Sequence, residues 1–103
     1  MEYNKKQQLY IIRCGNTNKF KIGVSKDPLK RCRQLQTGNP EILKIYFVFH
    51  INDSYKNIDA FKLEHIIHQF LKEQKNKHII NEWFELNEDI VFNIVKCLTK
   101  NFE

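Results

Sequence analysis

Two β-rich segments joined by a short turn signal constrain the fold of this chain more than any other feature. Residues 9–12 read Leu-Tyr-Ile-Ile, and residues 20–24 alternate large apolar side chains with Lys21 and Gly23. The intervening residues 15–19 read Gly-Asn-Thr-Asn-Lys, and Gly and Asn tolerate the positive φ angles of tight turns. The pattern predicts a β-hairpin whose second strand is half-buried.

A helix start follows the hairpin at Asp27 and Pro28. Aspartate is a favoured N-cap because it accepts a backbone amide hydrogen bond, and proline fits the first helical position. Gly38 and Pro40 are expected to end this helix, because glycine forms left-handed caps and proline cannot continue the helix. Three residues at helical spacing form its narrow apolar face: Leu29, Cys32 and Leu35.

The remaining segments complete an α+β pattern. Residues 42–51 predict a long central strand, and residues 82–86 a short edge strand. A second helix is expected over residues 58–72 and a third over residues 88–101, where it packs on the sheet. The second helix presents Ala60, Leu63, Ile66, Ile67 and Phe70 on one face, and the third presents Ile90, Val91, Ile94, Val95 and Leu98.

The predicted order is therefore β-β-α-β-α-β-α, an α+β arrangement with a small antiparallel sheet flanked by helices. A chain of 103 residues has too few apolar residues for two cores, so residues 1–103 are expected to form a single domain.

Charge and cysteine usage narrow the classes of function. The net charge of +5 and the isoelectric point near 9.2 favour a polyanionic partner. Cys14, Cys32 and Cys97 lie far apart, which argues against a zinc knuckle and a disulfide framework. Residues 1–8 lack the apolar stretch of a signal peptide, and the longest apolar run, residues 45–49, is too short to cross a bilayer. We expect an intracellular, cytoplasmic protein with reduced thiols and no membrane partner.

Glu64 and His68 are the first candidates for chemistry. They lie four residues apart in the second helix, so they are surface neighbours at the margin of its apolar face. A carboxylate in such a place can hold a divalent cation against a bound phosphate. An exposed Glu–His hydrogen bond explains the same spacing, so both interpretations stay open. His65 is expected to face solvent.

A second group of candidates is basic and follows the hairpin into the first helix. Arginine presents a planar fork that matches two phosphate oxygens, so Arg31 suits a scissile phosphate. A solvated charged face is the alternative. The group comprises Lys19, Lys21, Lys26, Lys30, Arg31 and Arg33.

Two aromatic residues also admit two interpretations. Tyr10 lies in the middle of the first strand, where a tyrosine is most often a core residue with a satisfied hydroxyl. Trp83 could stack a nucleic-acid base, but an aromatic residue at this point is more often part of the core. Neither a Ser-His-Asp order nor a phosphate-cradling glycine loop is present.

In combination, these motifs resemble the GIY-YIG nuclease superfamily. Gln8-Leu9-Tyr10 and Lys21-Ile22-Gly23 are similar to its two paired strand motifs, and Arg31 lies ten residues after Lys21, as in that family. Glu64 occupies the place of the metal-binding glutamate. Residues 35–40, Leu-Gln-Thr-Gly-Asn-Pro, and residues 82–84, Glu-Trp-Phe, resemble the phage Orf-type DNA-binding branch, which is T-five-like. The resemblance covers residues 9–86.

The resemblance implies a metal-dependent endonuclease that hydrolyses DNA phosphodiester bonds with one Mg²⁺ or Mn²⁺ ion. Glu64 would hold the ion, Arg31 would neutralise charge at the phosphorus, and Tyr10 would activate or orient the attacking water. His68 would support the metal or relay a proton. DNA is the expected partner, with RNA not excluded. Lys19, Lys21, Lys26, Lys30, Arg33 and Trp83 would contact the nucleic acid.

Three departures from the family pattern keep a second interpretation open. Gln8 replaces a glycine, Lys21 replaces the second tyrosine, and Leu35 stands where many members carry a histidine. A non-catalytic nucleic-acid-binding module of the same fold is therefore the main alternative, and a protein-interaction subunit with a basic surface is a third.

Overall fold

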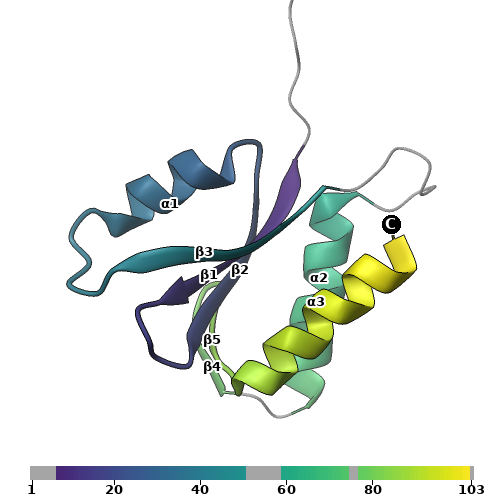
Figure 1. Cartoon of the computed structure of the whole chain (residues 1–103). Coiled ribbons are helices and arrows are strands. Elements are labelled where there is room, and N and C mark those ends of the chain that lie inside the picture. The colour runs from purple at the N-terminus through teal and green to yellow at the C-terminus, as the bar shows by residue number, and fades with distance from the viewer. Residues whose placement is uncertain (1–6, 51–58, 75–76, 103) are drawn as a thin grey trace, which may run out of the picture.

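Within the described residues, five strands and three helices alternate as β-β-α-β-α-β-β-α (Figure 1). The computed structural model describes residues 7–50, 59–74 and 77–102. The predicted α+β class and element order are confirmed, and the structure adds one strand, β4. The strands are β1 (Gln8–Cys14), β2 (Lys19–Ser25), β3 (Leu43–Phe49), β4 (Lys77–Ile80) and β5 (Trp83–Glu85). The helices are α1 (Pro28–Gln36), α2 (Ala60–Glu73) and α3 (Glu88–Phe102).

The sheet is antiparallel with the strand order β3-β1-β2-β5-β4. Two predictions about strand position are wrong. Residues 42–51 were expected to form the central strand, but β3 lies at one edge, and residue 51 falls outside the described residues. Residues 82–86 were expected at an edge, but β5 pairs with both β2 and β4. The β1–β2 hairpin occupies the middle of the sheet, so later strands can pair only with its two outer sides.

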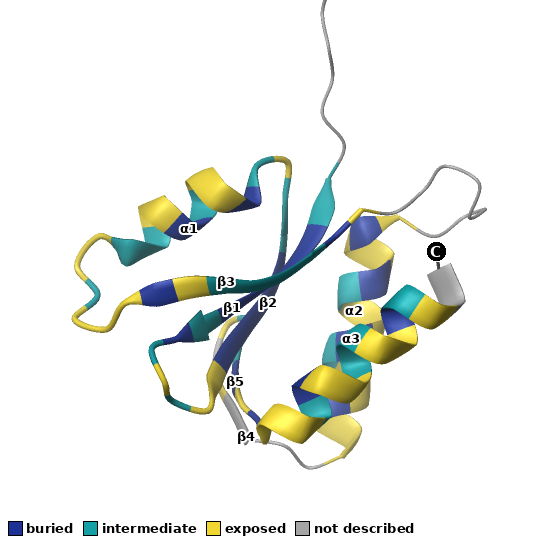
Figure 2. Ribbon diagram, in the orientation of Figure 1, coloured by how far each residue is buried: buried dark blue, intermediate teal, exposed yellow. Residues whose placement is uncertain are grey.

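Helices cover both faces of this sheet (Figures 1 and 2). On one face, α1 packs over a cluster that contains Tyr10, Ile12 and Cys32. On the other face, α2 and α3 pack over a larger cluster that contains Leu9, Ile11 and side chains of both helices. Both alternating sets of side chains in β1 are therefore buried, although period-two alternation normally separates a buried face from a solvated one.

Helix α1 begins and ends as the sequence indicates. The Asp27 side chain accepts a hydrogen bond of 3.2 Å from the amide of Lys30, Pro28 takes the first turn, and Gly38 adopts a φ of +79° beyond the end. Its predicted apolar face is partly wrong, because Leu29 is exposed. Pro28 fills the buried position beside Cys32 instead.

Helix α2 starts after its N-cap Asp59, and residue 58 lies outside the described residues. The predicted core positions Ile66 and Phe70 are about half exposed, at 48% and 49%. They line an open groove of about 550 Å³ between α2 and α3, whereas Leu71, which was not expected, is buried. Helix α3 packs on the sheet as predicted, through its buried residues Val91 and Leu98.

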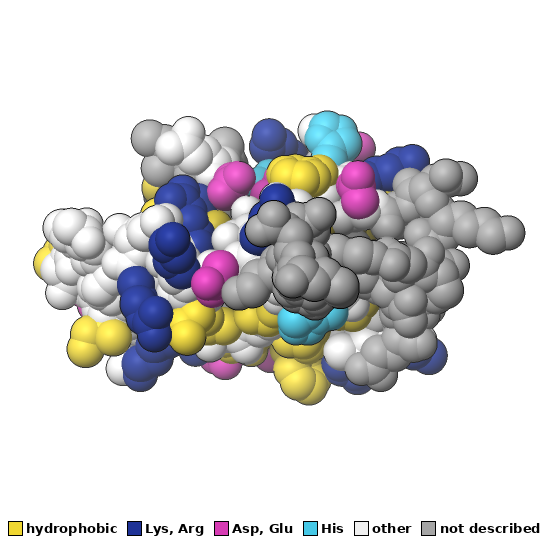
Figure 3. Space-filling view, turned by 90° about the horizontal axis from the view of Figure 1, so that it is seen from above, with side chains coloured by type: hydrophobic (Ala, Val, Ile, Leu, Met, Phe, Trp, Pro, Cys, Tyr) yellow, Lys and Arg dark blue, Asp and Glu magenta, His cyan; other side chains and the backbone are white. Residues whose placement is uncertain are grey.

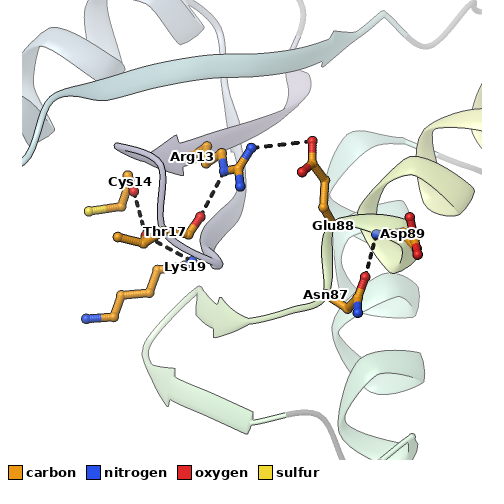
Figure 4. A network of polar contacts seen from close by, with 7 residues as sticks. All are labelled: Arg13, Cys14, Thr17, Lys19, Asn87, Glu88 and Asp89. Atoms are coloured by element: carbon orange, nitrogen blue, oxygen red, sulfur yellow. Dashed lines mark hydrogen bonds and ion pairs between the residues drawn. The ribbon is translucent and has the colours of Figure 1, made fainter.

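Arg13 ties the hairpin to the start of α3 (Figure 4). Its Nε donates to the carbonyl oxygen of Thr17 at 2.8 Å, and its terminal nitrogen lies 3.4 Å from a carboxylate oxygen of Glu88. The guanidinium also lies over the Phe20 ring, 5.2 Å from its centre. These contacts link the hairpin to the first residue of α3. No helix in the described part of the chain has the length and apolar character needed to cross a membrane.

Candidate active site

Tyr10 lies at the centre of the site, directly opposite Gly23 in the β1–β2 pairing. Its side chain is buried and accepts a hydrogen bond from the Arg31 guanidinium. Burial raises the pKa of Tyr10 to about 12, although the Arg31 hydrogen bond opposes the shift and Glu82 adds to it. The hydroxyl therefore keeps its proton at neutral pH and acts as a hydrogen-bonding group rather than as a base.

Gly23 provides the space that the Tyr10 hydroxyl occupies. A Cβ atom at this position would lie 2.5 Å from the Tyr10 hydroxyl oxygen and 3.0 Å from Oε1 of Glu82. Both distances are shorter than ordinary van der Waals contact, so any side chain here would push the two groups away. The absence of a side chain at residue 23 brings a phenol and a carboxylate together over β2.

Arg31 extends from the first turn of α1 to the Tyr10 hydroxyl. Its amide donates to the carbonyl of Asp27 at 3.0 Å, so the residue belongs to the turn set by the Asp27 cap. The side chain is partly buried, and its guanidinium contacts Tyr10. The cap at the start of α1 therefore fixes where this positive charge enters the site.

Glu64 of α2 and Glu82, which lies between β4 and β5, form a carboxyl pair joined by a side-chain hydrogen bond. Burial and, to a smaller extent, the charge and hydrogen bond of Glu82 raise the pKa of Glu64 to about 7, although the Lys21 charge opposes the shift. Glu64 also lies close enough to influence the pKa of Tyr10. The structure thus brings together Tyr10, Arg31 and Glu64, the three residues on which the sequence hypothesis depends.

Lys21 is buried, contrary to the expectation of a half-buried strand with a solvated polar face. Its side chain is only 6% exposed, its Nζ lies 2.8 Å from Oε1 of Glu82, and it lies 5.9 Å from the centre of the Trp83 ring. The reason is that β2 lies in the middle of the sheet with covered faces on both sides. A buried ammonium requires a partner, and Glu82 supplies it.

Glu82 is the site residue that sequence reasoning missed. It was treated only as the start of a strand, because nothing in its spacing connects it with Glu64 or Lys21. Glu82 lies beside β2, because its backbone carbonyl oxygen accepts a hydrogen bond of 3.1 Å from the amide of Ile22. A lysine in an otherwise apolar strand was the one available signal that a carboxylate must lie nearby.

His68 connects α2 to the sheet. Its Nε2 donates to the carbonyl oxygen of Ile22 at 2.8 Å, and its ring meets Phe84 edge to face at 5.1 Å. These contacts hold the helix that carries Glu64 against the strand that carries Lys21. His65 is exposed, as expected.

The other basic candidates lie on the surface. Figure 3 shows Lys and Arg side chains gathered in a band at the end of the molecule where α1 lies. Lys30 and Arg33 are exposed on α1, and Lys19 and Lys26 are exposed at the two ends of β2. Trp83 is partly buried against the α1-side cluster. The site therefore has an inner cluster, defined as Tyr10, Lys21, Gly23, Arg31, Glu64 and Glu82, and a separate basic surface.

The carboxyl pair of the inner cluster offers oxygen ligands of the kind that hard divalent cations prefer. The hydrogen bond between Glu64 and Glu82 shows that their oxygens converge, and Glu82 is 38% exposed, so this end opens to solvent. No group of three or more His, Cys, Asp or Glu side chains suited to a metal occurs within the described ranges. Magnesium is commonly held by one or two carboxylates, with water and substrate phosphate as the other ligands.

The fold and the inner cluster define a class of protein: a small α+β domain in which a tyrosine, an arginine and two carboxyl groups meet beside the central strands. The chain belongs to the T5orf172 domain family, whose profile matches residues 7–99. This is a nuclease-like, DNA-binding domain family. Comparison with curated proteins and with solved structures gives no match.

Proposed function

We propose that this protein is a metal-dependent endonuclease of the GIY-YIG type that hydrolyses DNA phosphodiester bonds. The observation that carries the proposal is the meeting of Tyr10, Arg31 and Glu64, which come from three different elements, in one inner cluster. The family match supports a nucleic-acid substrate, and the basic band near α1 offers a surface for its backbone.

Each residue of the cluster has a role that follows from its surroundings. Arg31 binds a non-bridging phosphate oxygen and stabilises the charge that develops there. Tyr10 keeps its proton and orients a water molecule by hydrogen bonding. Glu64, with Glu82 beside it, holds one Mg²⁺ or Mn²⁺, which when bound supplies Lewis-acid stabilisation of phosphate charge. His68 is a positioning residue, because its ring hydrogen-bonds to the Ile22 carbonyl oxygen and packs against Phe84.

A plasmid assay tests the proposal directly. Supercoiled DNA is incubated with the protein and Mg²⁺ or Mn²⁺, and nicked and linear forms are quantified. Glu64→Gln and Arg31→Ala should each lower the cleavage rate by about 100-fold or more, because the first removes a ligand of the cation and the second removes the positive charge that stabilises the phosphate in the transition state. Cleavage that continues unchanged in Glu64→Gln, or no cleavage of any DNA form by the wild type, would contradict the proposal.

The buried Lys21–Glu82 ion pair favours the alternative of a binding module without catalysis. In this case DNA binding is retained in Glu64→Gln, is weakened in Arg31→Ala, and is accompanied by no cleavage in the wild type. Measuring binding and cleavage on the same DNA separates the two functions.

A further inference from the structure

The inner cluster already contains a cation, the Lys21 ammonium. It contacts Glu82 at 2.8 Å, and its charge also acts on Glu64, whose pKa it lowers. Because the Lys21 side chain is almost fully buried, water screens this charge poorly. The ammonium is thus fixed beside both carboxyl groups.

The Lys21 ammonium repels any other cation that approaches the Glu64–Glu82 carboxyl pair. A divalent ion on Glu82 would share its ligand with the ammonium, which lies one hydrogen-bond length from that oxygen. Like charges at such separations repel strongly in a poorly hydrated site. Moving Lys21 away is also unfavourable, because its stem is packed in the sheet and its ammonium would lose its carboxylate partner.

We propose that Lys21 is the resident counter-cation of the Glu64–Glu82 pair and competes with the divalent cation for it. The inference rests on the proposed metal-dependent function and concerns how the same site is regulated. It implies that the DNA-free protein binds Mg²⁺ or Mn²⁺ weakly. The ion is then held well only when additional negative charge, such as that of a phosphate group, enters the site.

Trp83 provides a readout that does not depend on activity. It is the one tryptophan of the chain, and its ring lies 5.9 Å from the Lys21 ammonium. Titration of the DNA-free protein with MnCl₂ should quench its fluorescence, because paramagnetic Mn²⁺ quenches nearby indoles. Reversal with EDTA separates cation binding from irreversible changes.

The decisive variant is Lys21→Met, which keeps an unbranched side chain and removes the charge. It should bind Mn²⁺ about 10-fold more tightly than the wild type, because one fixed positive charge has been removed from the site. Lys44→Met is the matched control, since it makes the same change in net charge at an exposed position on β3. In the double variant Lys21→Met/Glu64→Gln, the gain should disappear.

The outcomes distinguish this inference from the proposed function. If wild type and Lys21→Met bind Mn²⁺ equally, or Lys21→Met binds it more weakly, Lys21 does not compete and the metal-dependent function still stands. If neither binds Mn²⁺ up to millimolar concentrations, the competition by Lys21 is refuted, and the plasmid assay decides the proposed function separately. Circular dichroism checks the fold of each variant, and Lys21→Gln carries the same expectation if Lys21→Met does not fold.

Discussion

At the scale of single residues, the inner cluster depends on the missing side chain of Gly23 as much as on the polar side chains around it. The Tyr10 hydroxyl and the Glu82 carboxyl meet over β2 because residue 23 has no side chain. Lys21, two residues before Gly23 in the same strand, can be buried because the Glu82 carboxylate neutralises its charge. The positions of these groups are therefore mutually dependent.

Replacing Gly23 by alanine should damage both stability and function. The new methyl group would overlap the Tyr10 hydroxyl, and relief of that overlap would displace Tyr10 or Glu82. We expect a loss of about 1–3 kcal/mol in the free energy of unfolding, which urea denaturation measures. Gly38→Asn is the control, because residue 38 has no neighbour within 4 Å and asparagine tolerates its positive φ. Equal effects of the two substitutions would contradict the proposed overlap.

The raised pKa of Glu64 predicts a pH dependence of stability in the metal-free protein. Its pKa is about 7 in the folded state and near 4.5 in the unfolded state, so the folded state binds the proton more tightly. The contribution of Glu64 to stability is therefore fully present below about pH 4.5 and is lost as the pH rises through about 7.

Glu64→Gln should remove this loss. After allowance for screening by water at a partly buried group, the variant should gain about 1–2 kcal/mol relative to wild type between pH 5 and pH 8. Urea denaturation in EDTA at several pH values measures the difference. Glu73→Gln, at the exposed end of the same helix, removes the same charge outside the site and serves as control. A difference that does not vary with pH would rule out this interpretation.

At the scale of elements, α1 and α2 bring their functional residues to the sheet by different means. Helix α1 is positioned by its Asp27 cap and buried Cys32, which places Arg31 beside Tyr10. Helix α2 is positioned by an apolar stripe and by His68, whose ring nitrogen bonds the β2 backbone. The carboxylate of Glu64 depends on this second attachment.

His68→Ala should therefore lower mainly the free energy of unfolding. It removes the hydrogen bond to the Ile22 carbonyl and the ring contact with Phe84, at an expected cost of about 1–3 kcal/mol. His65→Ala, on the exposed side of the same helix, should change the free energy of unfolding by less than about 0.5 kcal/mol. Thermal and urea denaturation provide the comparison. A His68→Ala variant with wild-type stability but lost Mn²⁺ binding would instead make His68 part of the metal site.

At the scale of the whole molecule, the two faces of the sheet carry different helices. The exposed basic residues Lys30 and Arg33 lie on α1, while α2 and α3 pack on the opposite face (Figures 1 and 3). The inner cluster takes Arg31 from α1, Tyr10 and Lys21 from the sheet, and Glu64 from α2. DNA that contacts the basic band would therefore lie on the side of the molecule from which Arg31 enters.

This arrangement predicts a salt dependence that can be assigned to one face. Lys30→Gln/Arg33→Gln should weaken DNA binding and reduce the slope of log K against log salt by about 2, because two phosphate contacts are lost. Lys96→Gln/Lys100→Gln on α3 removes the same charge from exposed positions on the opposite side and should leave the slope nearly unchanged. Fluorescence anisotropy at several salt concentrations measures the slopes. Equal slopes in both double variants would place the DNA elsewhere.

Local signals predicted much of the fold and part of the site. The hairpin, the Asp27 cap and the helical spacing of α2 depend on neighbours within a few residues, so they could be recognised directly. The partners of Lys21 and the strand order involve residues about sixty positions apart, and no local pattern encodes them. Tyr10 illustrates both cases, since its strand was predictable but its raised pKa was not.

The sequence alone determined the α+β class, the hairpin and the candidates Tyr10, Arg31 and Glu64, because short-range propensities and motif spacing are written in consecutive residues. Only the tertiary structure decided that Lys21 is buried, that β3 lies at an edge, and that Glu82 joins Glu64. The physical reason is that burial depends on which layers cover a strand from both sides. A buried charge must then find its partner through space, wherever that partner lies in the chain.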